Sequence, residues 1–113
     1  MRVKLSSKQK TELREQLYIR DGRNCSYCGI AEEDFCEIWG DTFYGGIKRG
    51  RILEIDRIDN NKGYSDKNCI LACALCNMAK SDKFTSIEFI LFGRVIKDIW
   101  EYRMKQLEKE KVK

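Results

Sequence analysis

Four of the six cysteines in this chain of 113 residues form two C-x-x-C pairs, Cys25/Cys28 and Cys73/Cys76. Two thiolates in one tight turn reach a single tetrahedral ion, and a second such turn completes its shell. The spacing therefore predicts one zinc ion that ties together two distant parts of the chain. Because four sulfur ligands leave no position for water, such a zinc stabilises the fold and does no chemistry.

Disulfide bonds and a redox C-x-x-C are the alternatives to zinc. The start of the chain, MRVKLSSKQK, is charged and has no apolar run behind it, so it does not resemble a secretion signal. Paired C-x-x-C motifs without such a signal favour zinc in a reducing compartment. No thioredoxin-like βαβ pattern accompanies either pair, which disfavours redox chemistry. We expect Cys36 and Cys69 to be small buried side chains.

The length of the chain fits one domain, residues 1–113, with a modest core that a structural metal would help to stabilise. The longest apolar cluster, Ile87–Gly93, is too short to span a bilayer. We therefore expect a soluble, cytoplasmic protein with no membrane partner.

Local patterns predict an α+β fold that contains a β-hairpin. Ser6 and Gln9 suit a capping box for a helix over about residues 7–20, which Gly22 ends. Residues 51–57 alternate with the period of a strand, and a second strand follows at Cys69–Ala72. The second cysteine pair opens a short helix, so the zinc and the hairpin form a core over about residues 24–82. Thr85 suits the cap of a helix over about residues 86–108.

The last helix carries apolar side chains over a wide face. One stripe consists of Ile87, Leu91, Val95, Ile99 and Tyr102, and beside it lie Phe89, Phe92, Ile96 and Trp100. The helical period predicts that this whole face belongs to the core. Gly93 interrupts the helix at a cost of about 1 kcal/mol relative to alanine.

The net charge is only +4, but basic residues are concentrated on both sides of the central segment. Lys48, Arg49 and Arg51 cluster in GGIKRGR. This distribution suits a polyanion such as nucleic acid, although ordinary solvated surface is the alternative explanation.

Residues 51–80, RILEIDRIDNNKGYSDKNCILACALCNMAK, resemble the HNH nuclease family, and within it a phage and bacterial subgroup with LEIDR-type hairpins and two zinc knuckles. The upstream LYIRDGRNCSYCG matches the usual lead-in, so the resemblance covers about residues 10–85. It implies a ββα-metal finger, in which a β-hairpin and a short helix hold one divalent ion against the scissile phosphate of DNA. The implied cofactors are a structural Zn²⁺ and a catalytic Mg²⁺ or Mn²⁺.

The resemblance also implies roles for five residues. Asp56 corresponds to the acidic metal ligand, and Arg57 stands where the family has its general-base histidine. Asn68 matches the central asparagine, which orients the base and the loop. Asn77 would complete the protein ligands of the ion, and Lys80 lies one helical turn further on, where it could meet a phosphate. Hard divalent cations prefer oxygen ligands of the kind that Asp56 and Asn77 offer.

The chain contains no histidine, so the base must come from elsewhere. Arg57 stays protonated and cannot accept a proton, but it could bind phosphate or stabilise the transition state. Asp59 is the first substitute. Tyr64 is a poorer one because a phenol ordinarily stays protonated at neutral pH. A water that loses its proton without any protein base is the third route.

Structural explanations exist for the same residues. Asp56 could form an ion pair with Arg57, Asn68 could stabilise a turn, and Asn77 could cap the short helix. Asn60 and Asn61 suit turn positions in which the side chain bonds its own backbone.

Three functions are therefore open. The first is a metal-dependent endonuclease acting on double-stranded DNA, with Lys48, Arg49, Arg51 and Lys80 in contact with the nucleic acid. The second is a catalytically inactive, zinc-stabilised nucleic-acid-binding module. The third is a protein-interaction module that uses Trp39, Phe43 and Tyr44. A homodimer would suit a double-strand cut, but no residue demonstrates one.

Overall fold

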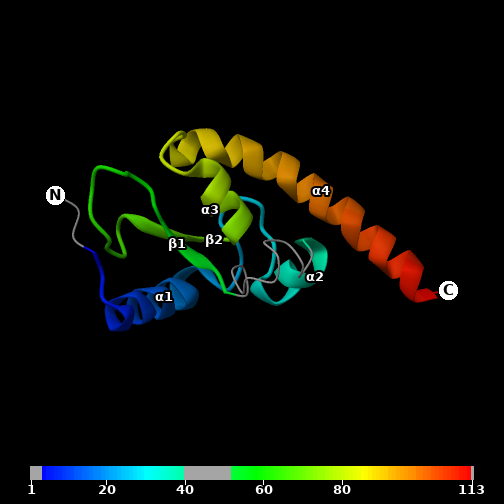
Figure 1. Cartoon of the computed structure of the whole chain (residues 1–113), viewed down its shortest axis with the longest axis horizontal. Helices are drawn as coiled ribbons and strands as arrows, with labels where there is room; N and C mark the ends of the chain where they lie inside the picture. Colours follow the sequence, from blue (N-terminus) through cyan, green and yellow to red (C-terminus); the bar gives the residue numbers. More distant parts are fainter. Residues whose placement is uncertain (1–3, 40–51, 113) are drawn as a thin grey trace.

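The structure is a computed structural model that describes residues 4–39 and 52–112, and its fold is α+β (Figure 1). Along the chain the elements are α1 (Ser7–Asp21), the 3-10 turn η1 (Glu32–Asp34), α2 (Phe35–Trp39), β1 (Glu54–Arg57), β2 (Cys69–Ala72), α3 (Ala74–Lys80) and α4 (Ser86–Val112). The predicted fold class and the order of helix, hairpin, short helix and long helix are confirmed. Helix α2 lies in a segment to which the sequence assigned no element. The single domain over residues 1–113 stays a prediction.

The two strands form an antiparallel hairpin in which Glu54 pairs with Ala72 and Arg57 pairs with Cys69. In Figure 1 the hairpin lies between α1 and α3, and α4 runs along the far side of α3. Successive side chains of a strand point to opposite faces, so Glu54 and Asp56 share one face of β1. The side-chain contacts described below show that α3 lies over that face.

Helix α1 begins and ends where the sequence predicts. The side chain of Ser6 accepts a hydrogen bond from the backbone of Gln9, whose own side chain accepts one from the backbone of Ser6. Gly22 follows the helix with φ 83°, a left-handed value that favours glycine. Leu13 and Leu17 are buried, and α1 packs against β2.

Helix α4 approaches the first cysteine turn at Gly93. A Cβ atom on Gly93 would lie 2.3 Å from the carbonyl oxygen of Tyr27, a distance at which the backbone must shift. The ring of Phe89 packs edge-on against the ring of Tyr27, with 5.1 Å between their centroids. Gly93 is therefore more than a helix-weakening residue, because its missing side chain lets α4 contact the turn.

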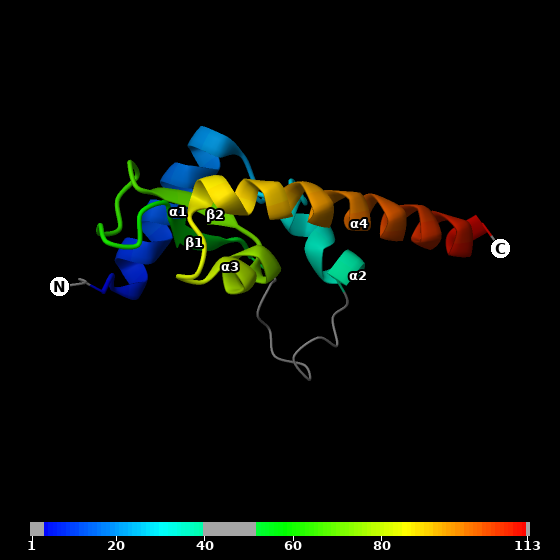
Figure 2. The ribbon, with the colours of Figure 1, turned by 90° about the horizontal axis from the view of Figure 1, so that it is seen from above.

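Only one side of α4 belongs to the core. Phe89 and Trp100 are 2% and 3% exposed, as predicted for their stripe, although Phe92 is 47% exposed. The prediction is wrong for the other stripe, whose members are exposed by 45–81%: Ile87, Leu91, Val95, Ile99 and Tyr102. The reason is that α4 contacts the rest of the described chain along one side, and its C-terminal part extends beyond the body of the molecule (Figure 2).

Within residues 4–39 and 52–112, none of the helices combines the length and the apolar character needed to cross a membrane. The predicted nucleic-acid contacts Lys48, Arg49 and Arg51 lie outside the described residues, as do Phe43 and Tyr44. Trp39 is half-buried and packs on Phe35, with 4.7 Å between the ring centroids.

Candidate metal centre and active site

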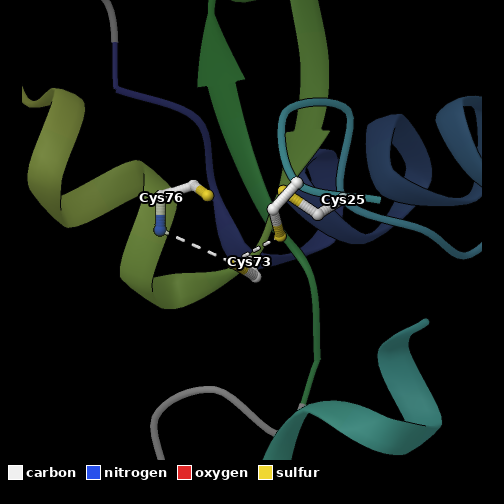
Figure 3. Close-up of side chains that lie close together, drawn as sticks. Cys25, Cys73 and Cys76 are labelled. Carbon is white, nitrogen blue, oxygen red and sulfur yellow. Dashed lines mark hydrogen bonds between the residues drawn. The ribbon is translucent and has the colours of Figure 1, made fainter. Parts of the chain in front are cut away.

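The four cysteines of the two C-x-x-C pairs meet in one buried cluster. Their sulfur atoms all lie within 4.8 Å of one another. Figure 3 shows Cys25, Cys73 and Cys76 with their side chains pointing toward a common centre. The sulfurs of Cys28 and Cys73 are 3.8 Å apart. Zinc–sulfur bonds of about 2.3 Å in a tetrahedron also place the sulfurs about 3.8 Å apart, so the cluster fits a zinc ion.

Local backbone structure holds each pair in its turn. In the first pair the amide of Gly29 donates to the carbonyl of Cys25 across 2.9 Å, and Gly29 has φ 77°. In the second pair Cys73 caps α3, and its sulfur accepts a hydrogen bond from the backbone of Cys76 across 3.5 Å. Each pair therefore presents both of its sulfurs on one side of a turn.

A residue from the last helix also contacts the cluster. The indole nitrogen of Trp100 donates a hydrogen bond to the sulfur of Cys28 across 3.2 Å. Hydrogen bonds with the neighbouring sulfurs, that of Cys28 first, lower the pKa of the Cys25 thiol. In the same cluster, hydrogen bonds with the sulfurs of Cys25 and Cys28 raise the pKa of the Cys73 and Cys76 thiols. Cys69, outside the cluster, is buried in β2 as predicted, and Cys36 is half-buried.

Helix α3 places two predicted site residues on the face of β1 that carries Glu54 and Asp56. Asn77 and Lys80 lie three residues apart on α3, so they share a helix face. The amide nitrogen of Asn77 donates to Glu54 Oε1 across 2.8 Å. The ammonium of Lys80 lies 3.2 Å from Asp56 Oδ1 and donates to the carbonyl of Arg57 across 3.1 Å. Strands β1 and β2 together with helix α3 thus form the ββα unit that the resemblance implies.

Lys80 occupies a different position from the expected one. Its side chain is fully buried, and Asp56 beside it is only 5% exposed. The expectation that Lys80 meets a phosphate stays a prediction; in this structure its ammonium is bonded to Asp56 and to a backbone carbonyl. The ion pair proposed for Asp56 and Arg57 forms instead between Asp56 and Lys80.

Asp56 has a second buried partner, which the sequence did not indicate. The hydroxyl of Tyr27 donates to Asp56 Oδ2 across 2.5 Å and lies 2.9 Å from the hydroxyl oxygen of Ser86. Burial, followed by the hydrogen bond with Asp56, raises the pKa of Tyr27 well above its ordinary value. The phenol therefore stays protonated and holds the carboxylate as a donor.

An open hollow of about 400 Å³ lies over the unit of β1 and α3. Three predicted site residues line it, namely Asp56, Arg57 and Asn77. The hollow is also lined by four other polar residues, Asn60, Tyr64, Ser81 and Asp82. The sequence analysis placed Asn60 in a turn, made Tyr64 a poorer candidate for the base, and gave Ser81 and Asp82 no role. Ser81, which follows α3, has φ 48°, a strained value for a residue with a side chain.

The long loop of the hairpin is held from within. Asn68 donates from its amide nitrogen to the carbonyls of Asp59 and Gly63, across 3.1 Å and 2.9 Å. Its side-chain oxygen accepts from the amide of Asp59 across 3.0 Å. All three bonds go to loop backbone, so Asn68 shapes the loop.

Arg57 and Asp59 differ in their relation to the hollow. The guanidinium of Arg57 donates to the carbonyl of Lys62 across 3.1 Å and lies 4.9 Å from the ring centroid of Tyr64. Asp59 accepts a hydrogen bond from the amide of Asn61 across 2.9 Å, as a turn residue does, and it lines a neighbouring hollow. The base role of Asp59 stays a prediction, while Tyr64 lies in the hollow itself.

Three residues of the site, Glu54, Tyr27 and Asp82, were not predicted from the sequence. Glu54 was within reach, because it precedes Asp56 by two positions in a strand and must share its face. Tyr27 and Asp82 gave no comparable signal, since only the packing of the first cysteine turn and the end of α3 brings them to β1.

Comparison with solved structures finds a protein of similar fold. The rare-cutting HNH restriction endonuclease PacI superposes with a TM-score of 0.63 and 26% sequence identity, over 88% of this chain and 87% of that one. No protein-family model and no curated protein matches the chain. The similar fold and the four-cysteine cluster together indicate a ββα-metal fold with a site for a structural metal ion. These two findings support a relationship to the HNH family, with a cysteine metal site.

Proposed function

We propose that this chain is a metal-dependent DNA endonuclease that hydrolyses phosphodiester bonds at the hollow over β1 and α3. Asp56 and Asn77 would hold one Mg²⁺ or Mn²⁺ ion there, and the four cysteines would hold a structural zinc. One observation carries the proposal: Asp56 and Asn77 line the same hollow in a fold similar to that of an HNH restriction endonuclease.

The donor atoms at the hollow suit a hard divalent cation. Asn77 uses its amide nitrogen on Glu54, so its oxygen is the atom that it offers. Each carboxylate oxygen of Asp56 already has one partner, and each has a second lone pair for another. When bound, such an ion polarises the phosphate and offsets the charge that develops in the transition state.

The cationic groups around Asp56 have separate tasks in this proposal. Arg57 lines the hollow, so its guanidinium is available to bind a phosphate oxygen and to stabilise negative charge as the bond breaks. Lys80 is buried and contacts Asp56 directly, so it acts as a positioning residue that fixes the orientation of this carboxylate. Asn68 supports the hairpin loop, in which the carbonyl of Lys62 accepts a hydrogen bond from Arg57.

The source of the base is part of the same proposal. Asp59, Tyr64 and a water acting without a protein base are the three candidates. Tyr64 has the favourable location, because it lines the hollow and Asp59 does not. Cleavage by Asp59→Asn and Tyr64→Phe variants separates the three, since the third route predicts that both variants remain active.

Double-stranded DNA is the proposed substrate. PacI is a restriction endonuclease that perturbs DNA, which supports DNA over RNA as the substrate here. The basic cluster Lys48, Arg49 and Arg51 is proposed to contact its phosphates. In contrast, Arg14 and Arg20 of α1 donate to backbone carbonyls of Leu53 and Cys69, so these two arginines have structural partners.

A catalytically inactive, zinc-stabilised nucleic-acid-binding module is the second candidate. One observation favours it: Lys80 already neutralises Asp56, which weakens the attraction of that carboxylate for a cation. Such a module would bind DNA in a salt-dependent manner without cutting it.

Cleavage of supercoiled plasmid by zinc-loaded protein distinguishes the two candidates. The endonuclease predicts relaxed or linear product with Mg²⁺ or Mn²⁺ and none with EDTA. Intact plasmid under every metal condition, together with salt-sensitive DNA binding, would support the binding module. Binding without any salt dependence would contradict both.

A further inference from the structure

The side chain of Asn77 makes one hydrogen bond within the part of the chain that the structure describes. Its amide nitrogen donates to Glu54 Oε1 across 2.8 Å. Both side chains are half-buried, and they approach each other from α3 and β1. Of the two ligands proposed for the divalent ion, Asn77 therefore depends on a single contact for its orientation.

The backbone of Asn77 is fixed independently of that contact. Its amide donates to the carbonyl of Cys73 across 2.9 Å, which places Asn77 one helical turn after the cysteine that caps α3. The backbone does not decide which end of the side-chain amide faces β1. Half a turn about the last side-chain bond exchanges the oxygen and the nitrogen, so a contact with the side chain itself must select one orientation.

Glu54 has the chemistry to select it. An ionised carboxylate only accepts hydrogen bonds, so the nitrogen of the Asn77 amide must face Glu54. The opposite orientation would bring two acceptor oxygens together without a proton between them. With its nitrogen held on β1, Asn77 keeps its oxygen for the hollow that it lines, and oxygen is the atom that a hard divalent cation needs.

We propose that Glu54 is a positioning residue of the divalent-ion site, which holds the Asn77 amide with its oxygen toward the ion. This inference rests on the proposed endonuclease function, in which Asn77 is a ligand. Asp56, the other proposed ligand, is held in the complementary way, because the donors Tyr27 and Lys80 bond its two oxygens. The ligand that only accepts is held by donors, and the ligand that can donate is held by an acceptor.

Two variants of Glu54 separate positioning from an effect of charge. Glu54→Gln removes the negative charge but keeps the length of the side chain and an acceptor oxygen for the Asn77 amide. Glu54→Ala removes the charge and the acceptor together. Positioning therefore predicts that glutamine rescues the site, whereas attraction of the cation by charge alone predicts that the two variants are equally poor.

The first measurement is the affinity of the full, zinc-loaded chain for Mn²⁺ without DNA, from the electron paramagnetic resonance of the free ion. Binding at the hollow is the part that Asp56→Asn abolishes. Glu54→Ala should raise the dissociation constant about 10–100-fold, as the loss of a residue that orients a metal ligand does. Glu54→Gln should stay within about threefold of wild type, because its amide can pair with Asn77 in either of two orientations. Glu12→Ala, at an exposed acid of α1, is the control and should bind as wild type does.

The second measurement reports on the Asn77 amide without any divalent ion. Its side-chain NH₂ signals in a ¹⁵N–¹H spectrum are identified by their absence in Asn77→Asp. They should move in Glu54→Ala and remain in place in Glu12→Ala. Glu54→Leu fills a similar space without an acceptor, and it replaces the alanine variant in both measurements if that variant does not fold.

The outcomes distinguish this inference from the proposed function. Wild-type Mn²⁺ affinity in Glu54→Ala with full zinc content, or Asn77 signals that do not move, would overturn the inference and leave the endonuclease proposal standing. Equal weakening in Glu54→Ala and Glu54→Gln would also overturn it, in favour of charge. Wild-type protein that binds no Mn²⁺ at the hollow would overturn the proposed metal site itself, and the inference with it.

Discussion

The hydroxyl of Tyr27 donates a hydrogen bond to Oδ2 of Asp56 across 2.5 Å, and this bond joins the first cysteine turn to the hollow over β1 and α3. Tyr27 stands between Cys25 and Cys28, so the residue that reaches Asp56 is carried by the turn that contributes two sulfurs. Order at the sulfur cluster is therefore transmitted to the carboxylate that we propose as a metal ligand. Lys80 approaches the other oxygen of the same carboxylate.

Tyr27→Phe should reduce DNA cleavage by roughly 10–100-fold, the loss typical for groups that hold a metal ligand in place. The variant keeps the ring that packs on Phe89 and loses only the bond to Asp56. Tyr18→Phe is the matched control, since Tyr18 is also a buried phenol bonded to a carboxylate, that of Glu32. Both variants should lose about 1–3 kcal/mol of stability, measured by urea unfolding.

The two variants should differ in their cleavage rate, because only Tyr27→Phe should cut DNA more slowly than wild type. Equal rates for Tyr27→Phe and Tyr18→Phe would show that the bond to Asp56 has no role in positioning. Single-turnover measurements on protein with verified zinc content make the comparison direct.

Tyr18 should make stability depend on pH in the alkaline range. Burial, followed by the hydrogen bond to Glu32, raises the pKa of Tyr18 from 10.0 to about 12. The unfolded chain loses this proton first, so the stabilisation is present below pH 10 and is lost as the pH rises to about 12. Urea unfolding of wild type and Tyr18→Phe at several pH values should show a steeper decline in the wild type. Parallel curves would contradict this.

Gly93→Ala should destabilise the protein, although alanine is the better helix former by about 1 kcal/mol. The added Cβ would lie 2.3 Å from the carbonyl oxygen of Tyr27, so α4 must move away from the cysteine turn. We expect a net loss of about 1–3 kcal/mol in thermal or urea unfolding. Gly63→Ala serves as the control, because nothing lies within 4 Å of a Cβ at Gly63. A Gly93→Ala variant more stable than wild type would contradict the close approach.

Zinc content should be one ion per chain, and its removal should unfold the core. Cys76→Ser should lose the ion, whereas Cys36→Ser should retain it, because the sulfur of Cys36 is outside the cluster. Metal analysis and circular dichroism test this. Because Trp100 donates to Cys28, chelation should also change tryptophan fluorescence. Retention of zinc by Cys76→Ser would contradict the four-sulfur site.

The sequence was sufficient for elements with local signals. The capping pair Ser6 and Gln9 placed α1, the alternation before Arg57 placed β1, and the two C-x-x-C pairs placed the metal cluster. Local hydrogen bonds and strand alternation determine these features, so they can be recognised one segment at a time.

Features that depend on how distant segments meet were missed. The helical period placed Ile87, Leu91, Val95, Ile99 and Tyr102 on one apolar stripe of α4. It carries no information on whether another segment covers that stripe. The same limit applies to Lys80. Its charge suggested a contact with a phosphate, but its buried position depends on the ion pair with Asp56, which comes from a distant segment. The bond between Tyr27 and Asp56 spans 29 positions and had no local signature.

Asp56 and Asn77 are proposed to form together the metal site at which DNA is cut. The most direct test is the Mn²⁺-dependent cleavage rate of Asp56→Asn and Asn77→Ala, with Asp66→Asn, an exposed loop acid, as the control. Asp56→Asn is preferred to alanine because it preserves size beside the buried Lys80. We predict rates reduced by more than about 100-fold in the first two variants and wild-type rates in the control. Wild-type cleavage by Asp56→Asn or Asn77→Ala, with zinc content intact, would contradict the claim.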